Sequence, residues 1–334
     1  MIHPSRPLLA LLGALCLAGS AAANDTVAAM GTGGLVLSRT DGIEMRSEDL
    51  YVSAREIRVR YRFYNRTDRD ISTLVAFPMP DIVGRPEGDI GVSEADPTML
   101  TPFTTVVDGR RMVTNVEQRV FMGPVEHTDL LKGLGVPLSP HLAATTEALG
   151  RLPQPQIDQL IELGMVEDRS WTDADGRHVD IAPLWTLKTT HYWTQVFKAG
   201  KELRVDHRYT PAIGGSAGSV FGDPESEAGE VANEEATRYC TDDAFRKGAR
   251  RMHARGLVMS ETWVDYVLTT GANWAEPIGD FRLVVDKGSS RNLVSFCGEG
   301  VRRTSGTSFE IRRRNFTPQS DLSVLILTGV RPAR

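Results

Sequence analysis

Residues 185–211 gather aromatic and histidine side chains of the kinds that bind sugars or transfer protons. Two of the five tryptophans and two of the seven histidines of the 334-residue chain lie in this stretch. Aromatic rings can stack on the faces of sugars, and an imidazole can act as a general acid or base. The stretch therefore contains a candidate binding surface: Trp185, His191, Tyr192, Trp193, His207 and Tyr209.

The same stretch has the alternation of two β-strands around a turn at Gly200. If the strands pair as a hairpin centred on Gly200, Trp193 lies opposite His207. The faces that carry these residues are mostly apolar, with Phe197 and Val205 among them. We therefore favour a core position for these faces, with His207 as a hydrogen-bonded interior residue, over an open site.

The first 23 residues have the pattern of a signal peptide. Arg6 gives a positive start, residues 8–19 form an apolar run too short to span a bilayer, and three alanines at 21–23 offer a cleavage site. We predict a signal peptide over residues 1–23, a mature chain that begins at Asn24, and no transmembrane anchor after cleavage. Removing the charge of Arg6 changes the formal net charge from −5 to −6. This acidic balance argues against a nucleic-acid partner.

Two cysteines remain when Cys16, in the predicted signal peptide, is set aside: Cys240 and Cys297. An even number of cysteines in an exported protein predicts a disulfide. The bridge would close a loop of about sixty residues and stabilise the fold by about 4 kcal/mol in the chain-entropy model. A metal-binding thiol pair is disfavoured, because no second His/Cys cluster stands at ligand spacing.

Two further patterns bear on metals and phosphates. Four carboxylates of the acidic tract 223–235 match positions of a calcium-binding loop: Asp223, Glu225, Glu227 and Glu234. Ala228 stands where that loop needs a glycine, which disfavours calcium. The glycine-rich residues 214–219 lack the lysine and hydroxyl ending of a phosphate loop, so we expect a mobile loop there. We predict no metal site and no cofactor.

Short alternating strands dominate the rest of the chain. The clearest strand, at residues 57–64, places apolar side chains on one face and arginines on the other, which we interpret as solvated. The whole pattern predicts a mainly β (α+β) fold, with antiparallel β-sandwich-like domains and a small helical insertion. The expected boundaries are a β-sandwich-like region at 24–122, a helical insertion at 123–165, and a β-rich region at 166–334 with one helix at 241–255.

Eight short segments follow one another in a distinctive order: Asn24-Asp25-Thr26, Gly33-Gly34-Leu35, residues 58–65, residues 77–81, Val107-Asp108-Gly109, residues 192–197, residues 205–211 and residues 281–287. In this order they resemble the exported bacterial family DUF4424, a domain of unknown function, over nearly the whole mature chain. The resemblance implies a protein of the Gram-negative envelope, located in the periplasm. It brings no catalytic residues.

Catalytic motifs do not favour an enzyme. The sequence contains no catalytic motif in a suitable structural setting. We looked for a nucleophile elbow, a His-Glu-x-x-His helix and a Ser-x-x-Lys motif. The preferred hypothesis is a non-enzymatic periplasmic binding or interaction protein, whose partner is an envelope protein or a glycan. The alternative is a periplasmic hydrolase that acts on envelope polymers, built from scattered residues such as Asp206, His207 and Asp242.

Overall fold

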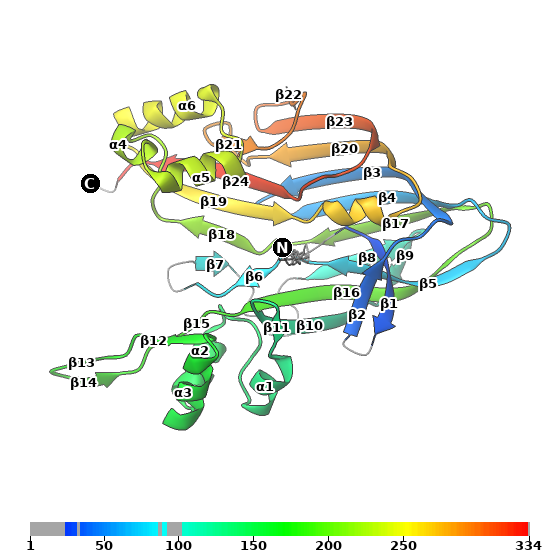
Figure 1. The fold of residues 1–334 in the computed structure, drawn as a ribbon. Coiled ribbons are helices and arrows are strands. Elements are labelled where there is room, and N and C mark those ends of the chain that lie inside the picture. Colours follow the sequence, from blue (N-terminus) through cyan, green and yellow to red (C-terminus); the bar gives the residue numbers. More distant parts are fainter. Residues whose placement is uncertain (1–23, 32–33, 86–88, 92–101, 333–334) are drawn as a thin grey trace, which may run out of the picture.

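The computed structural model describes residues 24–31, 34–85, 89–91 and 102–332. One layer of the fold is an eight-stranded sheet with the order β22-β23-β20-β3-β4-β17-β8-β9 (Figure 1). Its strands are antiparallel except that β3 and β20 run parallel. They are β3 (Ile43–Ser53), β4 (Ile57–Asn65), β8 (Phe103–Val107), β9 (Arg110–Met112), β17 (Glu202–Tyr209), β20 (Ile278–Asp286), β22 (Arg302–Arg303) and β23 (Ser308–Phe316).

Two further sheets cover the inner face of the eight-stranded sheet. The seven-stranded sheet contains β1 (Thr26–Gly31), β2 (Gly34–Ser38), β5 (Ile71–Pro78), β6 (Ile82–Val83), β10 (Asn115–Met122), β11 (Val125–Glu126) and β16 (Thr186–Phe197). The five-stranded sheet contains β7 (Asp89–Gly91), β18 (Ile213–Ser216), β19 (Val258–Tyr266), β21 (Leu293–Phe296) and β24 (Leu322–Val330). The predicted mainly β (α+β) fold is confirmed.

Alternation along the strands explains why these layers pack. In β4, Ile57, Val59, Tyr61 and Phe63 are each at most 1% exposed and belong to the main core, to which all three sheets contribute. The arginines between them face outward and pair with nearby acids, as Arg60 does with Asp206 at 3.4 Å. The basic face is therefore a solvated surface of ion pairs, and each pair adds little to the stability of the fold.

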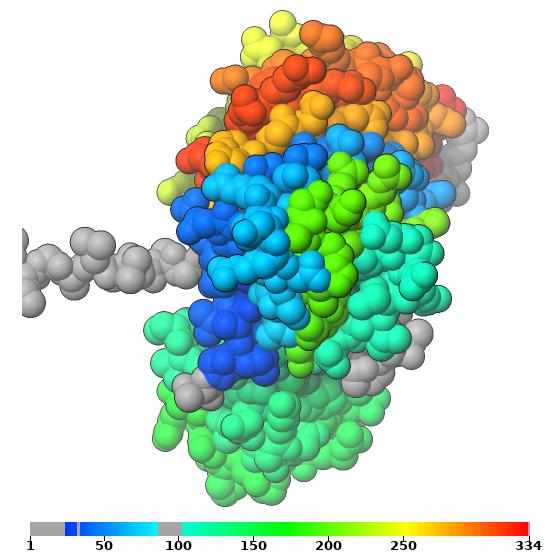
Figure 2. Space-filling model, turned by 90° about the vertical axis from the view of Figure 1, so that its right-hand side faces the viewer, coloured from blue at the N-terminus to red at the C-terminus, as the bar shows by residue number. Residues whose placement is uncertain are grey.

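Short helices cover one end of the seven-stranded sheet. They are α1 (Thr128–Gly133), α2 (Ala143–Gly150) and α3 (Gln154–Glu162), and they share a second core with β6, β10, β16, β12 (Val166–Asp168) and β15 (Ile181–Pro183). A hairpin of β13 (Trp171–Asp173) and β14 (Gly176–His178) extends away from the body (Figure 1). Figure 2 shows this helical region, in green, at the opposite end from the orange C-terminal strands.

The outer side of the five-stranded sheet is covered by α4 (Pro224–Glu227), α5 (Glu230–Arg238) and α6 (Asp243–Ala254). Helix α6 is the one predicted at 241–255, and the Asp242 carboxylate caps it by accepting from the Phe245 N–H at 2.7 Å. The acidic tract forms α4 and most of α5. Its carboxylates do not converge: Asp223 caps α4, and Glu227 pairs with Arg250 at 2.9 Å.

The prediction of a mobile loop at residues 214–219 is wrong for residues 214–216, because residues 213–216 form β18. This strand pairs with β19 and β7. A Cβ at Gly214 would lie 2.8 Å from a ring carbon of Trp263, and one at Gly215 would lie 2.7 Å from the Glu261 carbonyl oxygen. The glycines therefore permit close packing of strands.

The predicted hairpin at residues 185–211 is also wrong. Strand β16 pairs with β5 and β10 in the seven-stranded sheet, whereas β17 pairs with β4 and β8 in the eight-stranded sheet. The turn near Gly200 passes the chain from one layer to the other. Trp193 and His207 still face each other, with ring centroids 5.5 Å apart, but across the layers and not along a ladder.

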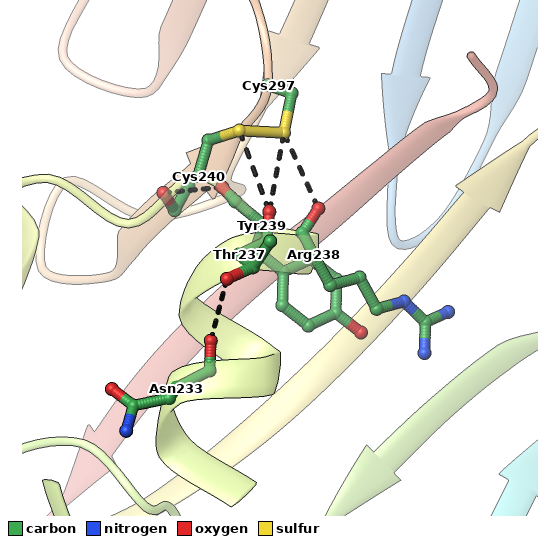
Figure 3. The surroundings of a disulfide bond; sticks show 7 residues. Asn233, Thr237, Arg238, Tyr239, Cys240 and Cys297 are labelled. Atoms are coloured by element: carbon green, nitrogen blue, oxygen red, sulfur yellow. Dashed lines mark hydrogen bonds between the residues drawn. A yellow bond between two sulfur atoms is a disulfide. The ribbon is translucent and has the colours of Figure 1, made fainter. Parts of the chain in front are cut away.

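The predicted disulfide between Cys240 and Cys297 is present (Figure 3). It joins the end of α5 to the residue after β21. Cys240 has a φ of 51°, and the N–H of Thr241 donates to the Ala236 carbonyl at 3.0 Å. This is a Schellman helix end with cysteine at the position where glycine is usual. None of the helices in the described ranges has the length and apolar character needed to cross a bilayer.

Removing the bridge should loosen the helices over the five-stranded sheet. We expect the double variant Cys240→Ser/Cys297→Ser to lose about 4 kcal/mol of unfolding free energy, because the unfolded chain regains the freedom of the closed loop. Urea unfolding of both proteins measures the difference. Equal unfolding midpoints, or free thiols found by mass spectrometry of the non-reduced wild type, would refute the bridge.

Candidate functional site

The structure places five of the six candidate binding residues in the interior. Trp185, His191, Trp193, His207 and Tyr209 are each at most 3% exposed. Tyr192, which points to the other side of β16, is half-buried against the small cluster around Ala76. These residues therefore do not form an open aromatic platform.

The interior residues divide between two cores. Trp185 belongs to the core of the helical region, where its Nε1 donates to the Leu138 carbonyl at 2.8 Å. The other four lie between the seven- and eight-stranded sheets. There the Phe103 ring stacks between His191, at 4.0 Å, and His207, at 5.2 Å.

His207 joins a buried chain of hydrogen bonds. Its Nε2 lies 3.0 Å from Asp25 Oδ1, and its Nδ1 lies 3.0 Å from Thr105 Oγ1. The side chains of Asp25 and His207 have no exposed surface. Burial raises the pKa of Asp25, while the neighbouring His207 acts in the opposite direction. Each ring nitrogen thus has a partner, so the imidazole is fixed in place.

The order carboxylate, imidazole, hydroxyl is the order of a nucleophilic triad. Here it is enclosed by rings, with Phe77 at 4.8 Å from His207 and Tyr61 at 5.9 Å. The other residues considered for a hydrolase lie elsewhere, since Asp206 faces outward to Arg60 and Asp242 caps α6. The geometry therefore gives His207 a structural role.

A second buried group lies beside this chain at the start of the described residues. Asn24 Nδ2 donates to Glu48 Oε2 at 3.0 Å, and Trp274 Nε1 donates to the Asp25 carbonyl at 2.7 Å. Burial, supplemented by Asp25, raises the pKa of Glu48 to about 8, although the Asn24 amide and the Tyr266 hydroxyl oppose the shift. Sequence reasoning did not single out Asp25, Glu48 or Trp274. The position of Asp25 in the family-like segment at 24–26 was the available signal.

A small pocket opens beside His191, and we call it the Tyr209 pocket. Its apolar wall includes Met79, Ile82 and Pro211, and its polar lining residues are Thr189, His191, Tyr209 and Asp265. It lies where β6, the middle of β16 and the end of β17 meet. Two residues of the candidate surface, His191 and Tyr209, therefore share one cavity.

Two of the polar groups of this pocket lack partners. Within the described residues, neither the Tyr209 hydroxyl nor the Thr189 Oγ1 has a hydrogen bond, although both atoms are buried. His191 Nδ1 lies 3.4 Å from Thr114 Oγ1. Burial, followed by the nearby His207, lowers the pKa of His191 to about 4, so its ring is neutral at neutral pH. The pocket thus offers neutral hydrogen-bonding groups in an apolar wall.

One exposed aromatic residue was missed by the sequence analysis. Trp171, in the projecting β13–β14 hairpin, is 53% exposed and stacks on His178 with ring centroids 4.9 Å apart. His178 Nε2 is held by Asp173 Oδ1 at 2.9 Å. Among the described residues, no group of histidine, cysteine, aspartate and glutamate side chains is placed to hold a metal ion.

The fold and the interior define the class of protein: a mainly β protein with helical insertions, a buried polar interior and a small pocket beside it. The chain matches the family model "Domain of unknown function (DUF4424)" over residues 23–325 and belongs to that family. The expected family is confirmed.

Other comparisons add a distant likeness. No curated protein matches the chain. Among solved structures, it is similar to a Legionella pneumophila protein described as a "putative nutrient binding protein", with 14% sequence identity and a TM-score of 0.46. The similarity covers 91% of this chain and 70% of that one.

Acid should destabilise the protein through His191. Its folded pKa lies below the ordinary 6.5, so below that pH the unfolded chain binds the extra proton and is favoured. Between pH 6.5 and about 4 the fold should lose on the order of 3 kcal/mol from this residue. His191→Gln should flatten the profile in urea titrations at stepped pH, whereas His253→Gln, exposed on α6, should keep the wild-type slope. Matching slopes for wild type and His191→Gln would contradict the buried neutral ring.

Loss of His207 should be costly. His207→Ala leaves the Asp25 carboxyl buried without its partner, so we expect a loss on the order of 3–5 kcal/mol of unfolding free energy. Arg208→Ala, on the outward face of the same strand, removes an exposed ion pair with Glu56 and should change stability by less than about 1 kcal/mol. Chemical unfolding measures both. Similar small effects for the two variants would contradict the assigned role.

Proposed function

We propose that this protein is a non-enzymatic binding protein of the bacterial periplasm, and that it holds a small neutral ligand in the Tyr209 pocket. The observation that supports this proposal is that Tyr209 and Thr189, whose buried hydroxyls have no partner among the described residues, line the same largely apolar cavity. Ligand sites combine apolar walls with a few well-placed polar groups. The disulfide and the predicted signal peptide support an oxidising, extracytoplasmic location.

The chemistry of the walls defines the ligand class. An unsatisfied buried hydroxyl costs about 1–3 kcal/mol, and a ligand that bonds to it recovers this energy. His191 is neutral, and the Asp265 carboxylate at the edge of the pocket is already bonded to Arg238 and Ser323. The pocket is small and therefore suits a very small neutral molecule with one hydrogen-bonding group, such as a hydroxyl or a carbonyl.

A macromolecular partner would have to bind at a surface other than the Tyr209 pocket. An envelope protein or a glycan needs exposed groups, and the interior position of Trp185 and Trp193 does not provide them. Trp171 on the projecting hairpin does. The alternative of a periplasmic hydrolase would need substrate to reach His207, and the surrounding rings of Phe77, Phe103 and Trp193 work against it.

Native mass spectrometry of protein purified from the periplasm, without denaturation, tests the proposal. We expect a co-purifying small molecule in the wild type. In Tyr209→Phe its occupancy should fall, while the ligand-free fold gains about 1 kcal/mol because an unpaired hydroxyl has been removed.

Tyr192→Phe is the matched control. It removes a tyrosine hydroxyl from the opposite side of β16 and should leave occupancy unchanged. A wild type that carries no small molecule, together with a destabilised Tyr209→Phe, would refute ligand binding in this pocket. Turnover of envelope polymers that His207→Ala abolishes would instead establish the hydrolase.

A further inference from the structure

The first described residue lies inside the protein. Asn24 is fully buried. Its backbone nitrogen donates to Thr270 Oγ1 at 2.7 Å, and this hydroxyl donates back to the Asn24 carbonyl at 2.7 Å. Its side-chain amide donates to Glu48 on β3. Thr270 lies in the 3₁₀-helix η1 (Thr269–Asn273), so the start of the fold is held between a central strand and a distant segment.

Acceptors outnumber donors around Asn24. In the described part of the chain, three buried oxygens here have no donor: Asn24 Oδ1, Asp25 Oδ2 and Glu48 Oε1. Two carboxyl groups share this interior, and His207 bonds to only one of them, that of Asp25. A positively charged group with several N–H donors would satisfy these acceptors and compensate their charge.

Hydrolysis of the peptide bond between Ala23 and Asn24 creates such a group at this position. Water adds across the bond, so Ala23 becomes a carboxylate and the nitrogen of Asn24 leaves as an amine. The amine is largely protonated at neutral pH. One amide N–H is thus replaced by three donors and a unit positive charge. The alanines at 21–23 fit the small-residue preference of a signal peptidase.

We propose that cleavage before Asn24 completes the core, because the new α-ammonium group binds the buried carboxylates of Glu48 and Asp25 and keeps its hydrogen bond to Thr270. In the uncleaved chain the nitrogen of Asn24 is a neutral amide and brings no positive charge to Glu48, so the precursor folds less stably than its product. Removal of the leader and formation of the stable fold are therefore coupled.

Several titratable groups face this position, from different elements. Glu48 comes from β3, Asp25 precedes β1, His207 comes from β17, and Tyr61 and Tyr266 come from β4 and β19. With the chain intact, the raised pKa of Glu48 means that stability falls as pH rises from about 4.5 to about 8. An adjacent ammonium group lowers this pKa and removes the loss.

Two forms of the mature protein test the proposal. One begins at Asn24, released from a fusion partner without an extra residue, and the other retains Ala23. At neutral pH we expect the unfolding equilibrium constant of the free-Asn24 form to be about tenfold smaller, equivalent to a pKa shift of one unit. In the Glu48→Gln background the two forms should differ much less, because the principal acceptor charge is gone.

A second measurement does not depend on the stability of any variant. Carbon-13 NMR should show the Glu48 carboxyl titrating near 8 in the Ala23 form and clearly lower in the free-Asn24 form. Equal stability and identical Glu48 titration in the two forms would overturn the proposal. So would N-terminal sequencing of the exported protein that finds a first residue other than Asn24. Failure of ligand binding at the Tyr209 pocket leaves these outcomes unaffected.

Discussion

The desolvation of charge is the constraint on which the rest of this structure depends. The carboxyl of Asp25 lies among aromatic rings, where an unpaired charge would be strongly unfavourable. It is tolerated because His207 bonds to it, and His207 is itself held by Thr105. These partners come from the segment before β1, from β17 and from β8. The segment before β1 and the eight-stranded sheet therefore cannot shift against each other without breaking these hydrogen bonds.

The sequence predicts which residues face inward better than it predicts which strands pair. The alternation at residues 57–64 and the Asp242 cap of α6 are local patterns, and the structure contains both. Strands β16 and β17 also alternate as expected. A period of two, however, identifies the buried face and not the neighbouring strand. Strand β16 pairs with β5 and β10, and β17 pairs with β4 and β8, so a stretch that resembles a hairpin crosses between layers instead.

The candidate site was predicted in part, for reasons that lie in particular residues. Histidines and tryptophans are candidates for a site because of their residue type. Thr105 is a residue type common in strands, so the sequence gives no reason to select it. The burial of Glu48 could not be predicted from the alternation of β3, because a β-bulge lies between Met45 and Ser47. The bulge shifts the strand register so that the even-numbered positions after it face inward. The Tyr209 pocket unites residues near 80, 190 and 210 that no spacing rule connects. Tertiary contacts alone bring such groups together.

The parallel pairing of β3 with β20 has a consequence for assembly. It lies in the middle of the eight-stranded sheet, yet its strands come from opposite ends of the chain. During synthesis, β3 emerges long before β20 exists, so one of its edges stays without hydrogen-bond partners. Such non-local pairing slows folding and leaves an open edge prone to association. The nascent protein should therefore depend on chaperones that shield this edge until the C-terminal third has been made.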